Sequence, residues 1–246
     1  MKLLAYSFAV FAAVLLTYLP SVRYEFVSYD DYEYVYQNPN VLGGLSRENL
    51  AWAVKSCGYA NNWHPLTWVS LQADASLLPG KLSVSPSGIP DKSFAPLSSV
   101  MHAHNVVLHA ANATLLFLLV VLMMRRLDSE TNAALPVIAL FALLWALHPL
   151  RTEVVCWVSE RKELLSVFFM LLTMIAYLKG GEKGRMRTGE YVFSLFAFAF
   201  ALLAKPVAVT LPAVLFAWDC AMAKKGLGRS LPSSFPFSFC PSARGC

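Results

Sequence analysis

The chain has 246 residues, of which 57% are hydrophobic and 14% are charged, and its mean hydropathy is +0.52. Because soluble domains average about 25% charged residues, this composition excludes an ordinary soluble enzyme domain and indicates an integral membrane protein. The net charge of +5 does not indicate nucleic-acid binding, because the basic residues stand between apolar runs and form no single patch.

Apolar runs are the main structural signal along the chain, since a helix needs about 17–25 residues to cross a membrane. The runs are Leu3–Leu19, Val100–Met124, Ala133–Leu150, Leu164–Leu178, Tyr191–Ala204 and Val207–Ala223. Lys205-Pro206 separates the last two, and proline disfavours helix in the residue before it. We predict an all-α polytopic membrane bundle, with one span in residues 1–20, an outer loop at 21–99 and five further spans in 100–223. The remaining residues, 224–246, are expected to form a disordered cytoplasmic tail.

The charged residues between these runs predict one orientation. If the N-terminus is cytoplasmic, the inner segments carry ten basic residues: Lys2, Arg125, Arg126, Lys179, Lys183, Arg185, Arg187, Lys224, Lys225 and Arg229. The outer loop 21–99 carries five basic and seven acidic residues. Positive charge accumulates on the cytoplasmic side of membrane proteins, so we expect the loop to lie on the outer or lumenal side.

The most polar part of that loop is the stretch SYDDYEYVYQNPNV at 28–41. Asp30 and Asp31 stand among four tyrosines there, directly after the first apolar run. Adjacent carboxylates can divide acid and base roles, since one raises the pKa of the other. The stretch is a candidate catalytic loop, with Asp30 as the base or as a ligand of the acceptor and Asp31 assisting. A solvated acidic turn, or a metal-binding pattern formed by Asp31 and Glu33, are the alternatives.

The outer loop also contains a candidate helix N-cap and a histidine before a proline, and the second span contains a row of polar residues. Ser46 is a plausible helix N-cap, and His64 precedes Pro65 in an aromatic stretch. His64 therefore stands either in an interfacial turn before a helix or beside the acidic pair. In the second span, polar residues recur at helical spacing and cover an arc of about 80°, which favours hydrogen bonding between helices. This stripe consists of His102, Asn105, His109 and Asn112.

Basic residues also gather after the third span and between the last two, on the same predicted side as the acidic loop. They are Arg151, Arg161, Lys162 and Lys205, and the stretch after the third span also contains Glu153, Glu160 and Glu163. One interpretation is a charged rim with internal salt bridges, whose long side chains extend to the membrane surface. The other is an anion pocket, because Arg and Lys at head-group level can hold a lipid phosphate. In that case His64 would belong to the same pocket.

Taken in order, five blocks resemble the membrane half of the transmembrane-and-tetratricopeptide-repeat O-mannosyltransferases and their bacterial relatives, which share the GT-C fold. The blocks are YDDYEYVYQNPNV, WHPLTWVSLQAD, HAHNVVLHAANATLLF, ALHPLRTEVVCWVSERKELLS and LLAKPVAVTLPAVLFAWD. The resemblance implies a multi-pass helical protein of the endoplasmic reticulum membrane, or of the inner membrane in bacteria. It also implies a dolichyl- or polyprenyl-phosphate sugar donor, a protein acceptor and catalysis by Asp30-Asp31. No metal or cofactor is implied.

The chain differs from that family after Ala223, where the family has further spans and 34-residue repeats. The stretch LPSSFPFSFCPSARGC shows no repeat pattern, so we expect a truncated or divergent form. The competing functions are therefore a non-catalytic relative that binds lipid or assembles with a partner, and a transporter subunit.

Overall fold

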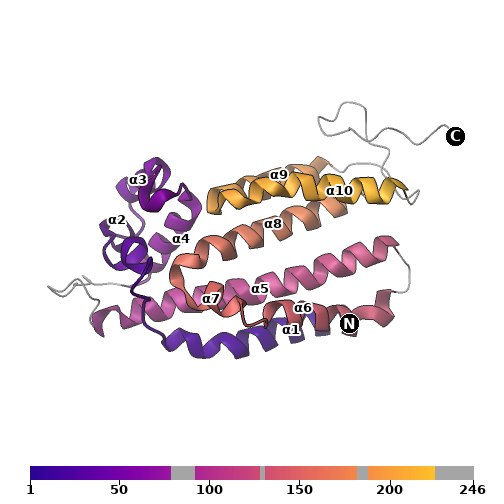
Figure 1. Ribbon diagram of the computed structural model, residues 1–246, viewed down its shortest axis with the longest axis horizontal. Helices are drawn as coiled ribbons and strands as arrows, with labels where there is room; N and C mark the ends of the chain where they lie inside the picture. The colour runs from indigo at the N-terminus through magenta and orange to yellow at the C-terminus, as the bar shows by residue number, and fades with distance from the viewer. Residues whose placement is uncertain (79–91, 128–130, 182–187, 225–246) are drawn as a thin grey trace.

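A computed structural model describes residues 1–78, 92–127, 131–181 and 188–224 of the chain, which form helices and loops without strands. The longer helices of the described residues run along the long axis of the molecule (Figure 1). They are α1 (Lys2–Tyr18), α5 (Ala95–Leu127), α6 (Thr131–Ala146), α8 (Arg161–Gly180), α9 (Thr188–Ala204) and α10 (Leu211–Lys224). The prediction of an all-α membrane bundle is confirmed.

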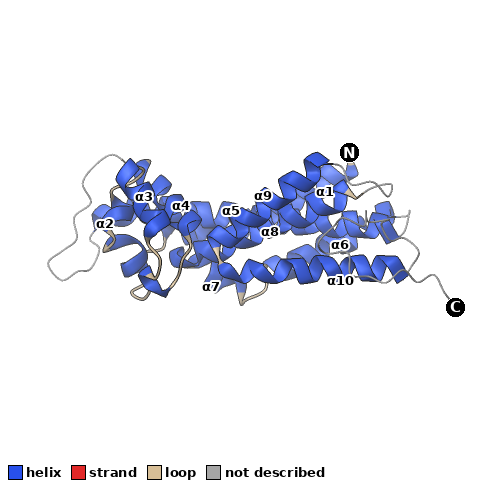
Figure 2. Cartoon of the chain, turned by 90° about the horizontal axis from the view of Figure 1, so that it is seen from above, coloured by secondary structure: helices blue, strands red, loops and turns tan. Residues whose placement is uncertain are grey.

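Shorter helices gather at one end of this bundle, and Figure 2 shows them from above at the end farthest from the N-terminus. The α-helices there are α2 (Pro39–Leu42), α3 (Arg47–Lys55), α4 (Pro65–Ser76) and α7 (Arg151–Cys156). A π-helix at Tyr32–Tyr36 precedes α2. The remaining turns are 3₁₀ helices at Leu19–Arg23, Tyr59–Asn61, Lys92–Phe94, Val158–Glu160 and Pro206–Thr210.

Three helical segments of the described chain are long and apolar enough to cross a membrane: Lys2–Arg23, Lys92–Leu127 and Val158–Gly180. Three shorter apolar segments accompany them: Thr131–Ala146, Thr188–Ala204 and Pro206–Met222. Each of the six predicted runs thus coincides with an apolar helical segment, and the protein is a membrane protein. The predicted tail lies outside the described residues, apart from Lys224.

Two predicted boundaries differ from the structure. The third run was expected to reach Leu150, but α6 ends at Ala146, because Pro149 disfavours helix in the residue before it. The second run was expected to start at Val100, but α5 begins at Ala95. Its added turn contains Leu97, which is buried in the core of the short-helix end, so packing extends the helix beyond the membrane-length run.

The core between α1, α5 and α6 is apolar, but α5 adds a buried polar stripe to it. Nε2 of His109 and the Tyr18 hydroxyl both donate to the carbonyl of Ala146, at 2.8 and 3.1 Å, so they satisfy the end of α6. Asn112 donates to the carbonyl of Leu164 at 2.9 Å. Buried helix ends need such partners because the membrane offers no water. The predicted role of the stripe in joining helices is confirmed at these positions.

Candidate functional site

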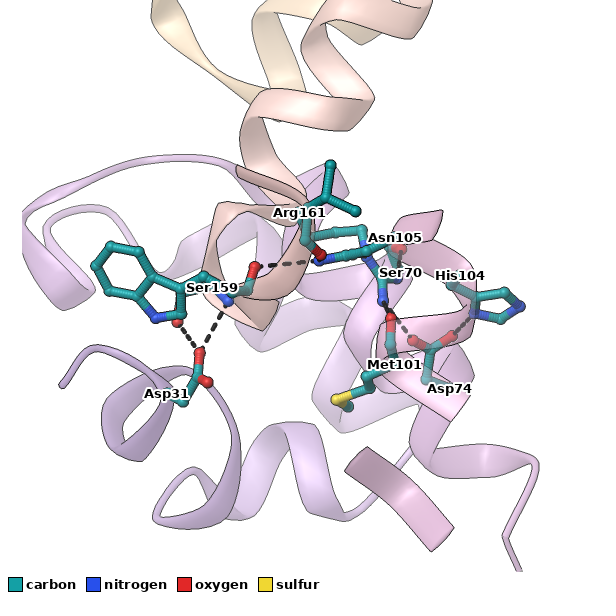
Figure 3. A network of polar contacts seen from close by, with 10 residues as sticks. Asp31, Ser70, Asp74, Met101, His104, Asn105, Ser159 and Arg161 are labelled. Carbon is teal, nitrogen blue, oxygen red and sulfur yellow. Dashed lines mark hydrogen bonds and ion pairs between the residues drawn. The ribbon is translucent and has the colours of Figure 1, made fainter. Parts of the chain in front are cut away.

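The second aspartate of the acidic loop is fixed inside the protein. Asp31 is fully buried, and one carboxylate oxygen accepts hydrogen bonds from the backbone N–H of Ser159, at 2.9 Å, and from its hydroxyl (Figure 3). The other oxygen accepts from the backbone N–H of Val27 at 2.9 Å. Burial raises the pKa of the Asp31 carboxyl, and these hydrogen bonds oppose that rise. Both oxygens are therefore occupied in tying the loop to the segment before α8.

The first aspartate is placed differently. Asp30 is partly exposed, and its backbone carbonyl accepts from the N–H of Tyr34 at 2.9 Å, at the start of the π-helix. Helices of this type are rare and often occur at functional sites. Burial raises the pKa of the Tyr34 hydroxyl, and the negative charges of Asp30 and Glu160 raise it further. The carboxylate of Asp30 is thus the accessible member of the acidic pair.

Tyr34 connects the acidic loop to His64. The two rings are stacked with centroids 5.4 Å apart and planes 12° apart, and Trp68 lies against both at 4.7 Å. His64 immediately precedes α4, which starts at Pro65 as predicted. Its Nε2 is buried and has no hydrogen-bond partner among the described residues. The structure therefore brings His64 beside the acidic loop, with a polar atom still to be satisfied.

Two lysines lie near these stacked aromatic rings. Nζ of Lys162 lies 4.7 Å from the centroid of the Tyr34 ring and 3.0 Å from Glu160. Lys205, in the extended break between α9 and α10, lies 2.8 Å from Glu163 and 3.7 Å from Glu160. Glu160 therefore contacts both ammonium groups, so that the two lysines belong to one ion-pair cluster.

The side chain of Arg161 lies in a different environment from that of its neighbour Lys162. Its side chain is buried and donates to Asp74 at 2.9 Å, to Ser70 at 2.9 Å, to the carbonyl of Met101 at 2.7 Å and to Asn105 (Figure 3). Asp74 is equally buried, and its second oxygen contacts His104. Since its guanidinium is saturated inside the fold, Arg161 ties α4, α5 and α8 together.

Arg151, the fourth basic candidate, is placed over an aromatic ring. Its guanidinium carbon lies 4.4 Å from the ring centroid of Trp145 in α6. The structure gives it no ion pair with the acidic groups around Lys162. Of the predicted site residues, the side-chain contacts therefore join His64, Lys162 and Lys205 through Tyr34 and Glu160, and the backbone of Asp30 is bonded to that of Tyr34. Asp31 and Arg161 are buried in separate supporting networks.

Sequence reasoning assigned no role to Ser159, and it placed Glu160 and Glu163 only in a charged rim with internal salt bridges. The two glutamates are three residues apart, which places them on neighbouring positions of a helical turn, so their spacing could have marked them as joint partners of a lysine. Asp74 was also left out, although a single carboxylate in an otherwise uncharged helix indicates a buried partner. The partner of Asp31 offered no comparable signal, because a serine is common in such loops.

The environment of His64 predicts a pH dependence of stability. Burial, followed by the positive charges of Lys162 and Lys205, lowers the pKa of His64 from 6.5 to about 4. In the unfolded chain the imidazole binds a proton below about pH 6.5, whereas in the folded protein it does so only below about 4. The free energy of unfolding should therefore fall by about 3 kcal/mol as the pH drops from 6.5 to 4, and level off below that.

The measurement is unfolding in detergent between pH 4 and 8, with His64→Gln as the comparison. The variant lacks the titrating ring, so its stability should change less in this window than that of the wild type. Equal pH slopes in the two proteins would show that His64 titrates normally in the folded state.

Comparison with known proteins supports a relationship with sugar transferases. The chain is 27% identical over 220 residues to protein O-mannosyl-transferase TMTC1 of Mus musculus, which covers 83% of this chain and 21% of that protein. It is 31% identical over 132 residues to protein O-mannosyl-transferase TMTC3 of Mus musculus, covering 53% and 13% respectively. No family model matches the chain, and no solved structure matches it.

The helical bundle defines a membrane protein, and its sequence is similar to those of glycosyltransferases. Within that class, the chain is a distant homologue of the protein O-mannosyl-transferases TMTC1 and TMTC3. It spans about a fifth of the length of the first and about an eighth of the second.

Proposed function

We propose that the chain transfers a sugar, mannose by analogy with its relatives, from a polyprenyl-phosphate donor to a serine or threonine hydroxyl of a protein. The observation that carries this proposal is the convergence of Asp30, His64, Lys162 and Lys205 at one end of the bundle. These residues come from four separate segments. Contacts through Tyr34 and Glu160 connect His64, Lys162 and Lys205, and Asp30 is joined to Tyr34 by a backbone hydrogen bond. We assign this end to the outer or lumenal side, because the charge bias of the six proposed spans favours a cytoplasmic N-terminus.

The chemistry needs a base and an anion-stabilising group, and the cluster contains both. Asp30 accepts the proton of the acceptor hydroxyl, because a neutral hydroxyl is a weak nucleophile. The hydroxyl oxygen then bonds to the anomeric carbon of the sugar, and the bond from that carbon to the phosphate oxygen breaks. The lipid phosphate leaves with the electron pair, and the ammonium groups of Lys162 and Lys205 stabilise its charge.

The supporting residues have distinct roles in this proposal. Asp31 assists by holding the loop that presents Asp30, through its bonds to Ser159 and Val27. His64 is neutral at physiological pH, because its pKa is about 4, and its unpartnered Nε2 can hydrogen-bond to the donor. The position of Arg161 supports a structural role, and Arg151 lies against Trp145, so neither is assigned to the phosphate.

The direct test is a transfer assay on the chain in lipid nanodiscs, with a radiolabelled mannosyl-phosphoryl-polyprenol and a serine- and threonine-rich peptide. We expect label on the peptide that β-elimination releases, as for a sugar linked to a hydroxyl. Binding of the donor without transfer would instead support a lipid-binding or assembly role. Absence of both binding and transfer would contradict the proposal.

A further inference from the structure

The ion pairs around Lys162 and Lys205 affect which kind of phosphate the proposed site binds most tightly. Lys205 is bound by Glu163 at 2.8 Å and lies 3.7 Å from Glu160, and Lys162 is 3.0 Å from Glu160. The two positive charges therefore already have two negative partners before any ligand arrives. An incoming anion must share the ammonium groups with these carboxylates or displace them.

Among the described residues of this cluster, no further positive charge is available to compensate a more highly charged ligand. The guanidinium of Arg161 is enclosed and engaged with Asp74. The imidazole of His64 is neutral above about pH 4. On the negative side, Asp30 adds a third carboxylate whose charge acts on Tyr34. The cluster therefore contains more carboxylates (Glu160, Glu163 and Asp30) than ammonium groups (Lys162 and Lys205).

The two phosphate species of the proposed reaction differ in charge. The donor is a phosphodiester with a single negative charge. The product is a lipid phosphomonoester, which carries about −1.5 to −2 at pH 7 because its second pKa is about 6. A site with two lysines and no carboxylates would hold the product more tightly than the donor, and the product would then inhibit turnover.

We propose that Glu160 and Glu163 make the site selective for singly charged lipid phosphodiesters over doubly charged lipid phosphomonoesters, so that the product is released after transfer. This inference rests on the proposed function and goes beyond it by naming two specificity-determining residues. The two carboxylates repel the second negative charge of the product. The two ammonium groups still attract an anion that carries one negative charge. Both glutamates are only partly exposed, with 16% and 26% of the side chain accessible, so water screens this opposition incompletely.

The test compares the affinities of three short isoprenyl probes for the chain in nanodiscs at pH 7.5. The probes are a methyl phosphodiester, a phosphomonoester and a sulfate monoester, which is tetrahedral but singly charged. For the wild type we expect the diester and the sulfate to bind at least as tightly as the phosphomonoester. Inorganic phosphate is included as a competitor, and weak competition would show that the lipid chain contributes to binding.

The variants Glu160→Gln and Glu163→Gln should each shift the preference toward the phosphomonoester by about tenfold relative to the diester, since a charge a few ångströms away is removed from a partly screened site. Glu163→Asp keeps the charge and should keep the wild-type preference. Glu153→Gln is the matched control, because Glu153 is an exposed carboxylate in the neighbouring helix α7.

The possible outcomes separate this inference from the proposed function. If the probes bind but the Gln variants leave the preference unchanged, or if Glu163→Asp shifts it as much as Glu163→Gln, the glutamates do not select by charge. A wild type that prefers the phosphomonoester over the sulfate overturns the inference even without a variant. If no probe binds the wild type, the proposed function itself is contradicted.

Discussion

Replacing Asp30 by Asn should slow sugar transfer by about 10²–10⁴-fold, the usual contribution of a positioned general base. The amide keeps the size of the side chain and much of its hydrogen bonding, but it cannot accept the hydroxyl proton. Because Asp30 is partly exposed, the substitution should leave expression, membrane insertion and thermal stability unchanged. The measurement is the initial rate of transfer at saturating donor concentration.

The adjacent position gives an informative comparison for this experiment. Asp31→Asn removes a buried acceptor of hydrogen bonds from Ser159 and Val27, so it should lower stability as well as activity. Glu48→Gln, in the exposed first turn of α3, serves as the control and should behave as the wild type does. Full activity of Asp30→Asn would remove this residue from the mechanism.

The second large effect is expected for stability, at the buried pair of Arg161 and Asp74. Removing either partner leaves an uncompensated charge in the interior, which costs about 3–5 kcal/mol. We therefore expect Arg161→Met and Asp74→Asn each to lower the free energy of unfolding by that amount in detergent. The double variant should lose less than the sum of the two, because the charges are removed together.

Arg125→Met is the matched control for this cycle, since Arg125 is an exposed arginine near the end of α5. Its stability should remain within about 0.5 kcal/mol of the wild type. If Arg161→Met were equally mild, the network drawn in Figure 3 would not hold α4 and α8 to α5 as described. Additive losses in the double variant would likewise show that the two charges do not interact.

The sequence predicted the membrane helices well because their apolar runs are long and their boundaries carry proline or charge. The Ser46 N-cap was likewise predicted from a local signal. In the structure its hydroxyl accepts a hydrogen bond from the backbone N–H of Asn49 at 3.1 Å. Both features depend on residues near each other in the chain. Local patterns of this kind carry most of the information about where a helix begins, ends and turns its polar face.

The different environments of adjacent charged residues could not be predicted from such local patterns. Asp30 and Asp31 have the same chemistry and neighbouring positions, yet only Asp31 is covered by Ser159. Arg161 and Lys162 are also adjacent, but successive residues on a helix point about 100° apart, so one enters the core and the other faces Tyr34. Which partners each residue meets depends on helices far away in the sequence, and a local pattern holds no information about them.

The long separation between the loop and its anchor affects how the protein is made. Asp31 and Ser159 are 128 residues apart, and Thr67 donates to the carbonyl of Ala204 across 137 residues. At about 5–20 residues per second, the ribosome adds the 128 residues in roughly 6–26 s. During this interval the acidic loop exists without the segment that orders it. The acidic loop is therefore ordered only after the start of α8 has been synthesised, and the proposed active site is completed later still, when Lys205 follows α9.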